Sequence, residues 1–131
     1  MYCIDSSILA AFVVKEEGWK KLIKYLVDGV TIDLAFKETL NVIWKKAKLL
    51  NEEIDIKNAL LKIKKLRKVL IIYPQEELHD LALEISLENN ISIYDALFIA
   101  LALNENLTLV TKDKRQKEVA EKLNIDVILE K

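Results

Sequence analysis

The sequence of 131 residues is poor in the residues that mark several common functional classes: it has one cysteine, one proline, two glycines and one histidine. A single cysteine, Cys3, excludes an internal disulfide, so we expect a reducing, cytoplasmic location. With so little glycine the chain has no glycine-rich phosphate loop, which argues against a nucleotide-binding P-loop or a dinucleotide-binding fold. The only histidine, His79, lies in a polar stretch, so we expect neither a Ser-His-Asp triad nor a histidine-based zinc site.

Long apolar runs are also missing. The most apolar stretch, 91–103, contains an aspartate and is too short to span a bilayer. The first residues, Met-Tyr-Cys-Ile-Asp, have no basic segment before an apolar run, so we expect no signal peptide and no membrane association. The net charge of −1 gives no general affinity for nucleic acid. Binding of that kind has to come from local lysines or from carboxylates neutralised by a metal ion.

The composition is that of a folded protein. Apolar residues make up 52% of the chain and charged residues 31%, and the length suits one domain over residues 1–131 with one hydrophobic core. The 18 lysines, 13 glutamates and many isoleucines and leucines favour a thermophilic source, whereas the eight asparagines argue against one.

Short apolar strands alternate with helical patterns along the whole chain. We expect strands at 2–5, 30–32, 69–73, 107–111 and 126–129. We expect helices at 8–14, 19–27, 33–50 (capped by Asp33), 55–68, 75–89, 92–103 and 114–123. This alternation indicates an α/β domain with a mostly parallel sheet. The strands are continuous apolar runs, so we expect helices on both faces of the sheet, in three α/β/α layers.

Two aspartates follow strands in this pattern. Asp5 ends the first strand just before two serines, and Asp113 follows the fourth strand by two residues. Each can simply be the N-cap of the next helix, and for either residue alone that is the simpler interpretation. Both also lie where the strands of a parallel sheet end, which is where such sheets bind ligands.

Glu38 is harder to explain as a structural residue. Its neighbours at helical spacing are Leu34, Ala35, Asn41 and Val42. None of them is basic, so no ion pair within the helix is available. The stripe is mostly apolar and should face the core, where a carboxylate is costly unless it is paired or binds a metal ion.

Asp95 poses the same problem. It is the only charged residue in the apolar helix 93–103, which should be buried because it is apolar all round. Ser92 stands three residues earlier, at the spacing of a capping box with Asp in place of Glu. That motif explains the spacing but not the presence of an unpaired acid in a buried helix.

Together, Asp5, Glu38, Asp95 and Asp113 form a candidate metal and catalytic centre. If they converge, each raises the pKa of the others unless a cation lies between them. A ligand set made only of oxygens suits Mg²⁺ or Mn²⁺ rather than zinc. Such an ion polarises phosphoryl oxygens and lowers the pKa of bound water, which permits phosphodiester hydrolysis without a nucleophilic side chain.

Four segments resemble, in order, the acidic motifs of PIN-domain nucleases. They are YCIDSS (2–7), FKETLNV (36–42), SIYDALFIALA (92–102) and LVTKDKR (109–115). Each motif alone is weak, but the four in sequence are fairly specific and span the whole chain. A single PIN domain of this length most resembles the VapC-type toxins of toxin–antitoxin pairs.

The resemblance implies a parallel sheet flanked by helices, Mg²⁺- or Mn²⁺-dependent endoribonuclease activity, a homodimer, and inhibition by a VapB-type antitoxin. Carried over by motif, Asp5, Glu38, Asp95 and Asp113 are the acidic ligands. Thr111, Ser6 and Asn41 are supporting polar residues that orient carboxylates or metal-bound waters.

Basic residues near the motifs are candidate RNA contacts. Lys112, Lys114 and Arg115 surround Asp113 and are the best placed of them. A second basic run, at 57–68, is more simply a solvated helix face. Aromatic residues make up only 7% of the chain, so base stacking is not evident.

Other α/β folds fit less well. A response-regulator receiver needs paired acids at the end of its first strand, and a haloacid dehalogenase needs Asp-x-Asp where this chain has Ser7. A non-catalytic PIN-fold module that binds a protein or RNA partner stays open as an alternative, because a fold does not determine a function.

Overall fold

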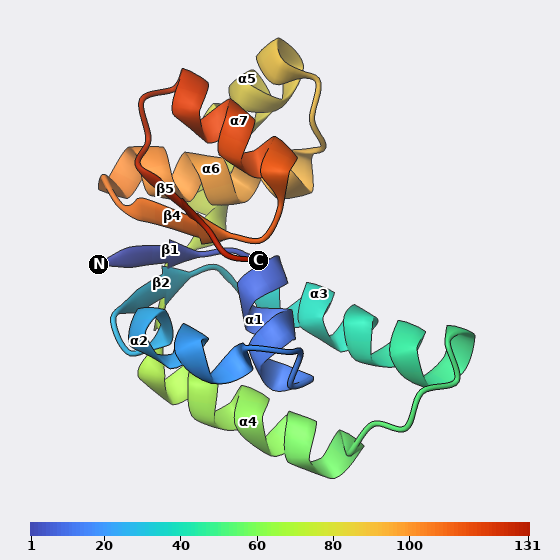
Figure 1. Ribbon diagram of the computed structural model, residues 1–131. Helices are drawn as coiled ribbons and strands as arrows, with labels where there is room; N and C mark the ends of the chain where they lie inside the picture. The colour runs from blue at the N-terminus through green and yellow to red at the C-terminus, as the bar shows by residue number, and fades with distance from the viewer.

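The computed structural model describes residues 1–131 and contains one five-stranded sheet in the order β3-β2-β1-β4-β5 (Figure 1). The strands are β1 Tyr2–Ile4, β2 Gly29–Thr31, β3 Ile71–Ile72, β4 Thr108–Thr111 and β5 Val127–Leu129. Every neighbouring pair is parallel. The chain moves outward from β1 to β3 and then returns to the other side of β1. Successive strands are therefore added on one side of β1 up to β3 and on its other side from β4 onward. Open parallel sheets bind ligands at the carboxyl ends of the two strands where this change occurs, here β1 and β4.

Helices cover both faces of this sheet (Figure 1). On one side lie α1 Ser6–Val13, α2 Ile23–Leu26, α3 Asp33–Trp44 and α4 Ile56–Val69. On the other lie α5 His79–Asn89, α6 Ile93–Glu105 and α7 Lys114–Lys122. Short 3-10 segments precede α2 (Trp19–Leu22) and α5 (Gln75–Leu78), and a π-helical segment follows α3 (Lys45–Leu49). The expected three-layer α/β/α fold with a parallel sheet is confirmed. No helix combines the length and apolarity needed to cross a membrane.

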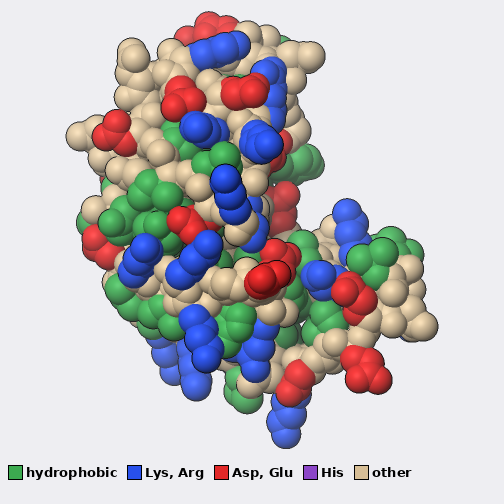
Figure 2. All heavy atoms as spheres, in the orientation of Figure 1, with side chains coloured by type: hydrophobic (Ala, Val, Ile, Leu, Met, Phe, Trp, Pro, Cys, Tyr) green, Lys and Arg blue, Asp and Glu red, His purple; other side chains and the backbone are tan.

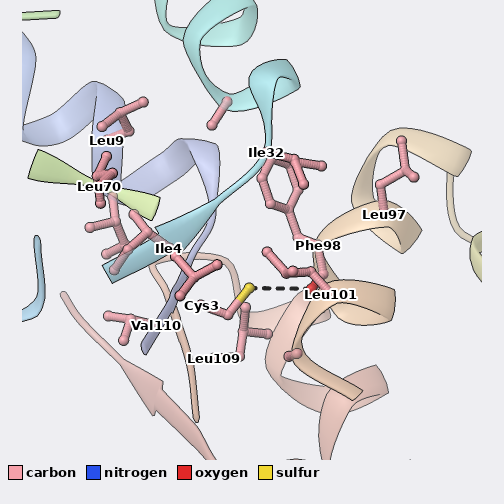
Figure 3. Packing of buried hydrophobic residues seen from close by; sticks show 14 of the residues in the cluster. Cys3, Ile4, Leu9, Ile32, Leu70, Leu97, Phe98, Leu101, Leu109 and Val110 are labelled. Carbon is pink, nitrogen blue, oxygen red and sulfur yellow. Dashed lines mark hydrogen bonds between the residues drawn. The ribbon is translucent and has the colours of Figure 1, made fainter. Parts of the chain in front are cut away.

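The core lies between the sheet and the helices of both layers (Figure 3). Cys3 is fully buried in the central strand, and its thiol donates a hydrogen bond to the carbonyl of Phe98 in α6 at 3.3 Å. Seven consecutive α6 residues, from Ala96 to Ala102, are buried, as the apolar pattern predicts. Burial of a side chain such as Phe98 contributes roughly 2 kcal/mol to stability. This packing fixes the first turn of α6, which carries Asp95.

Asparagine takes the place of glycine at several helix ends. Asn51, Asn90, Asn106 and Asn124 all have a positive φ, between 52° and 60°. Two of them are the left-handed C-caps of α5 and α6. Asparagine tolerates this conformation better than most residues. Helix termination therefore accounts for four of the eight asparagines in this glycine-poor chain.

Several details differ from the sequence predictions. β3 has only two residues because α4 continues to Val69, and the amide of Leu70 still donates to the carbonyl of Leu66. The helix expected at 19–27 is a 3-10 turn followed by one α-helical turn, and the helix expected at 75–89 also begins with a 3-10 turn. The helix expected at 33–50 is α-helical only to Trp44 and continues as a π-helix to Leu49.

Asp33 also departs from its predicted role, because it does not cap α3. It is the first residue inside the helix, where it pairs with Lys37 and Arg67. The free amide of Leu34 is capped instead by the side chain of Gln75, 41 residues later.

Candidate active site

Asp5 lies at the carboxyl end of the central strand and is only 3% exposed. Its Oδ1 accepts hydrogen bonds from the amides of Ser7 and Ile8, at 3.1 and 3.3 Å, so it caps α1 as the sequence suggests. Burial raises the pKa of this carboxyl to about 6, although hydrogen bonds from Ser7 and Thr111 lower it. Capping therefore accounts for one oxygen, but it does not compensate for taking the carboxylate out of water.

Hydroxyl groups connect Asp5 to the turn that carries Asp113. The Thr111 hydroxyl donates to Oδ2 of Asp5, and the amide of Asp113 donates to Thr111 Oγ1 at 3.0 Å. Ser7 makes a second link: its hydroxyl donates to Oδ1 of Asp5 at 2.6 Å and accepts from the amide of Lys112 at 2.9 Å. Thr111 and Ser7 thus link the carboxyl end of β1 to the turn that follows its neighbour β4.

Asp113 is exposed and caps α7, with its Oδ1 accepting from the amides of Arg115 and Gln116 at 2.8 and 3.4 Å. The capping role expected of Asp113 is thus present, as it is for Asp5. Neither cap uses both oxygens of its carboxylate, because the capping amides bond only to Oδ1 of Asp113 and only to Oδ1 of Asp5.

Glu38 and Asp95 are half-buried and electrostatically coupled. Burial raises the pKa of Glu38, and the charge of Asp95 raises it further, while a hydrogen bond with Ser6 lowers it. Burial also raises the pKa of Asp95, followed by the charge of Asp113, while a hydrogen bond with Ser92 lowers it. The charge of Asp95 is therefore coupled to that of Glu38 and to that of Asp113, as expected for like charges near one another.

Comparison with known proteins identifies the fold family. Residues 2–122 match the family model described as PIN domain. The chain belongs to the PIN domain family.

Relatives of this PIN domain include VapC-type nucleases from Pyrobaculum aerophilum. The chain is 30% identical over 120 residues to Ribonuclease VapC3, covering 88% of this chain and 91% of the relative. It is 30% identical over 116 residues to Exonuclease VapC9, covering 86% and 80%. The crystal structure of PAE2754 from the same organism superposes with a TM-score of 0.67 at 25% identity, covering 93% and 92% of the two chains. This is a family of nucleases that generally hydrolyse phosphodiester bonds with a divalent metal ion.

The donor set of this PIN domain fits such an ion in its chemistry. All candidate ligands are carboxylates with hydroxyl neighbours, whereas Cys3 is buried against α6 and His79 is exposed on α5. Oxygen ligands of this kind suit Mg²⁺ or Mn²⁺. In the structure, however, no three acidic, cysteine or histidine side chains are arranged to hold one ion together. The acids are linked in pairs, from Glu38 to Asp95 and from Asp95 to Asp113.

The three supporting residues predicted from sequence have different surroundings. Thr111 is fully buried between Asp5 and Asp113, and Ser6 lies beside Glu38. Asn41 is exposed on α3, and its side chain makes no hydrogen bond. Thr111 and Ser6 make hydrogen bonds with candidate acids and Asn41 does not, and the supporting role of all three stays a prediction.

The basic residues near α7 have protein partners. The ammonium group of Lys112 lies 3.5 Å from the carboxylate of Glu16, and the guanidinium of Arg115 donates to the carbonyl of Asn89 at 2.8 Å. Lys114 is exposed and has no ion pair. Of the three candidate RNA contacts, Lys114 is therefore the one whose charge is available without breaking an existing contact.

The basic run on α4 largely faces solvent, as the simpler interpretation predicts. Lys57, Lys64, Lys65 and Lys68 are exposed. Arg67 has a structural role instead, because it pairs with Asp33 at 2.7 Å and its guanidinium lies over the ring of Phe36.

Two polar residues at the site were not identified from sequence. The first is Ser7: the serine pair after Asp5 marks both positions, but only Ser6 is predicted as a supporting residue. Gln116 is 3% exposed, and its side-chain amide donates to the carbonyl of Asp95 at 3.1 Å. Nothing in the local sequence distinguishes a buried glutamine from an exposed one on such a polar helix.

Proposed function

We propose that the chain is an endoribonuclease that cleaves RNA with Mg²⁺ or Mn²⁺ held by Asp5, Glu38, Asp95 and Asp113. The observation that carries the proposal is the coupling of three carboxylates through Asp95. A fourth carboxylate, the buried Asp5, is linked to Asp113 through the Thr111 hydroxyl. A relative whose name describes it as a ribonuclease supports RNA as the substrate.

Each part of the site has a distinct role in this proposal. A bound ion supplies Lewis acidity at a phosphoryl oxygen and a water of lowered pKa. Ser7 and Thr111 hold the Asp5 carboxylate in one orientation, which reduces the side-chain reorganisation needed when a ligand binds. Glu38 and Asp95 bring two more carboxylates from separate helices, where burial and mutual repulsion favour partnership with a cation.

Circular single-stranded RNA provides a direct test. An endonuclease linearises a circle, whereas an exonuclease, the activity named for the second relative, requires an end. We expect purified protein to cleave circular and linear RNA of the same sequence with Mn²⁺ or Mg²⁺ and to lose this activity in EDTA. The corresponding DNA circle should be cut far more slowly. Cleavage of linear RNA alone would contradict the endonuclease assignment. A protein that binds RNA but cuts neither form would favour the binding module.

We further propose that the nuclease is the toxin of a VapBC-type pair and that a VapB-type antitoxin inhibits it. A groove of about 340 Å³ lies between α1, α2 and α4 and is mostly apolar. Its lining includes Phe12, Ile23, Leu26, Val27, Leu66 and Val69, with Lys62 and Lys65 beside them. Lysine and arginine side chains crowd the surface over α2 and α4 (Figure 2). A partner segment with apolar and acidic side chains matches this surface.

The partner proposal is tested by co-expression with the product of a small adjacent gene. We expect that product to bind the nuclease and suppress its RNA cleavage. Val27→Glu places an acid in the groove at a side chain that is 64% exposed, so it should restore cleavage without disturbing the core. Leu87→Glu is the matched control, because Leu87 is 76% exposed on α5, across the sheet. Equal inhibition of both variants would exclude the groove as the binding site.

A homodimer is also part of the proposal. Trp44, Leu49 and Leu50 are more than half exposed at the outer end of α3, where the chain extends away from the sheet (Figure 1). Contiguous exposed apolar side chains of this size are typical of interaction surfaces. We expect a sedimentation mass of two chains, and a mass of one 15.1 kDa chain would contradict the dimer.

A further inference from the structure

Gln116 contacts two of the four acidic residues from a buried position on α7. Its backbone amide donates to Oδ1 of Asp113 at 3.4 Å, which completes the cap of the helix. Its side-chain Nε2 donates to the backbone carbonyl of Asp95 at 3.1 Å. Only 3% of the residue is exposed. One residue is therefore bonded to the carboxylate of one acid and to the backbone of another.

No other hydrogen bond joins α6 to α7. The neighbouring polar link, from Arg115, runs to the carbonyl of Asn89 at the end of α5 instead. The other buried residues of α7 are the apolar Val119 and Ala120. Apolar packing is not directional, whereas a hydrogen bond fixes both a distance and an angle. The first turn of α6, which carries Asp95, and the start of α7, which Asp113 caps, are thus held in register by this amide.

The same side chain contains an unsatisfied group. Oε1 of Gln116 is buried and has no hydrogen-bond donor. A buried acceptor without a partner destabilises a fold, and an apolar side chain of similar shape would avoid that cost. Stability alone therefore explains the side-chain amide at this position poorly, although its Nε2 group donates a hydrogen bond to the carbonyl of Asp95.

We propose that Gln116 is a positioning residue that sets the spacing of Asp95 and Asp113 and so determines how tightly the site binds a divalent ion. This inference rests on the proposed function, because it assumes that both acids are metal ligands. Metal affinity is sensitive to such supporting contacts: their loss typically weakens binding about 10- to 100-fold. Small displacements of ligands are sufficient, because the productive geometry tolerates only about 0.5 Å.

Gln116→Met is the most informative variant. Methionine keeps the unbranched shape of glutamine but removes both the donor to Asp95 and the unpaired acceptor. We expect the metal-free variant to melt at the wild-type temperature or above, because the unsatisfied acceptor is gone. Calorimetry at neutral pH should nevertheless show Mn²⁺ affinity reduced about 10-fold or more. Gln116→Leu should behave in the same way and serves if the first variant does not fold.

Two controls separate positioning from general loosening. Val119→Ala opens a cavity under the same helix without touching either acid, so it should lower the melting temperature and leave Mn²⁺ affinity within about twofold. Glu121→Gln removes an exposed acid from α7 and should change neither property.

The possible results distinguish a failure of the positioning role of Gln116 from a failure of the proposed metal site. Weaker Mn²⁺ binding by Gln116→Met than by Val119→Ala supports a positioning role. Mn²⁺ affinity within twofold of wild type overturns that role, and so does equal weakening by Val119→Ala. If wild-type protein itself binds no Mn²⁺, the metal site is wrong and the inference falls with it.

Discussion

The hydroxyl of Thr111 donates a hydrogen bond to the carboxylate of Asp5, which lies 106 positions earlier in the sequence. The same oxygen accepts the amide proton of Asp113, so a single hydroxyl connects a strand-end acid to the acid that begins α7. This contact joins β1 and β4, the neighbouring parallel strands at which the strand order changes from one side of β1 to the other. It explains physically why a threonine stands two residues before Asp113 in a site built on the ends of β1 and β4.

Asp5 should make the stability of the metal-free protein depend on pH. Its pKa is near 4 in an unfolded chain, and burial raises it to about 6 in the fold. The folded state therefore binds this proton more tightly, so the contribution to stability is full below pH 4 and is lost as the pH rises through 6. Asp5→Asn stays neutral, and its stability relative to wild type should increase over that range by about 3 kcal/mol, at 1.36 kcal/mol per pKa unit.

Urea unfolding in EDTA between pH 4 and pH 7 measures this difference. Asp80→Asn is the control, because Asp80 is an exposed acid on α5. A difference between Asp5→Asn and wild type that stays constant across the range would show that Asp5 does not titrate with a raised pKa.

Ser7 should matter for stability more than its neighbour Ser6. Ser7→Ala removes the hydroxyl that donates to Asp5 and leaves the amide of Lys112 without its acceptor. Loss of such a partner costs about 1–3 kcal/mol. Ser6→Ala should cost less, since Ser6 makes no bond to the turn after β4. Chemical unfolding of both variants tests the ranking, and equal losses would argue against the link through Ser7.

Much of the fold follows from local sequence signals. The strand ends and helix starts near Asp5, Ser92 and Asp113 are predicted because capping acts within three residues. The buried helix α6 is predicted from its apolar composition alone. The same reasoning identified Glu38 and Asp95 as anomalous, and both are half-buried acids whose pKa values are raised.

Contacts between distant segments could not be predicted in the same way. The cap of α3 comes from Gln75, 41 residues beyond the amide it satisfies, so the prediction that Asp33 caps this helix is wrong. Gln116 is buried only because α7 docks on the first turn of α6. The placement of β4 on the other side of β1 depends on strand order, which periodicity does not encode. The four candidate acids are thus predicted from sequence, whereas a contact from a distant segment of the chain, such as that of Gln116 with Asp95, is not.

Gly29, at the start of β2, should not tolerate a side chain. A Cβ atom there would lie 2.7 Å from Cδ2 of Leu70 and 2.8 Å from Cγ1 of Ile4. Overpacking of this kind costs about 1–3 kcal/mol, so we expect Gly29→Ala to destabilise the protein by that amount. Gly18→Ala is a comparison with a different cause: φ is +81° there, and the nearest atoms belong to the flexible side chain of Lys21. Wild-type stability of Gly29→Ala in urea unfolding would contradict the packing around β2.

Asp95→Asn provides the most direct test of the four-acid site, because Asp95 is coupled to both Glu38 and Asp113. The measurement is the rate of Mn²⁺-dependent cleavage of single-stranded RNA by Asp95→Asn, with Asp80→Asn as a charge-matched control and thermal unfolding of both. We predict that Asp95→Asn folds with wild-type or higher stability and loses about 100-fold or more of the cleavage rate, while Asp80→Asn keeps it. Cleavage by folded Asp95→Asn at the wild-type rate would contradict the account.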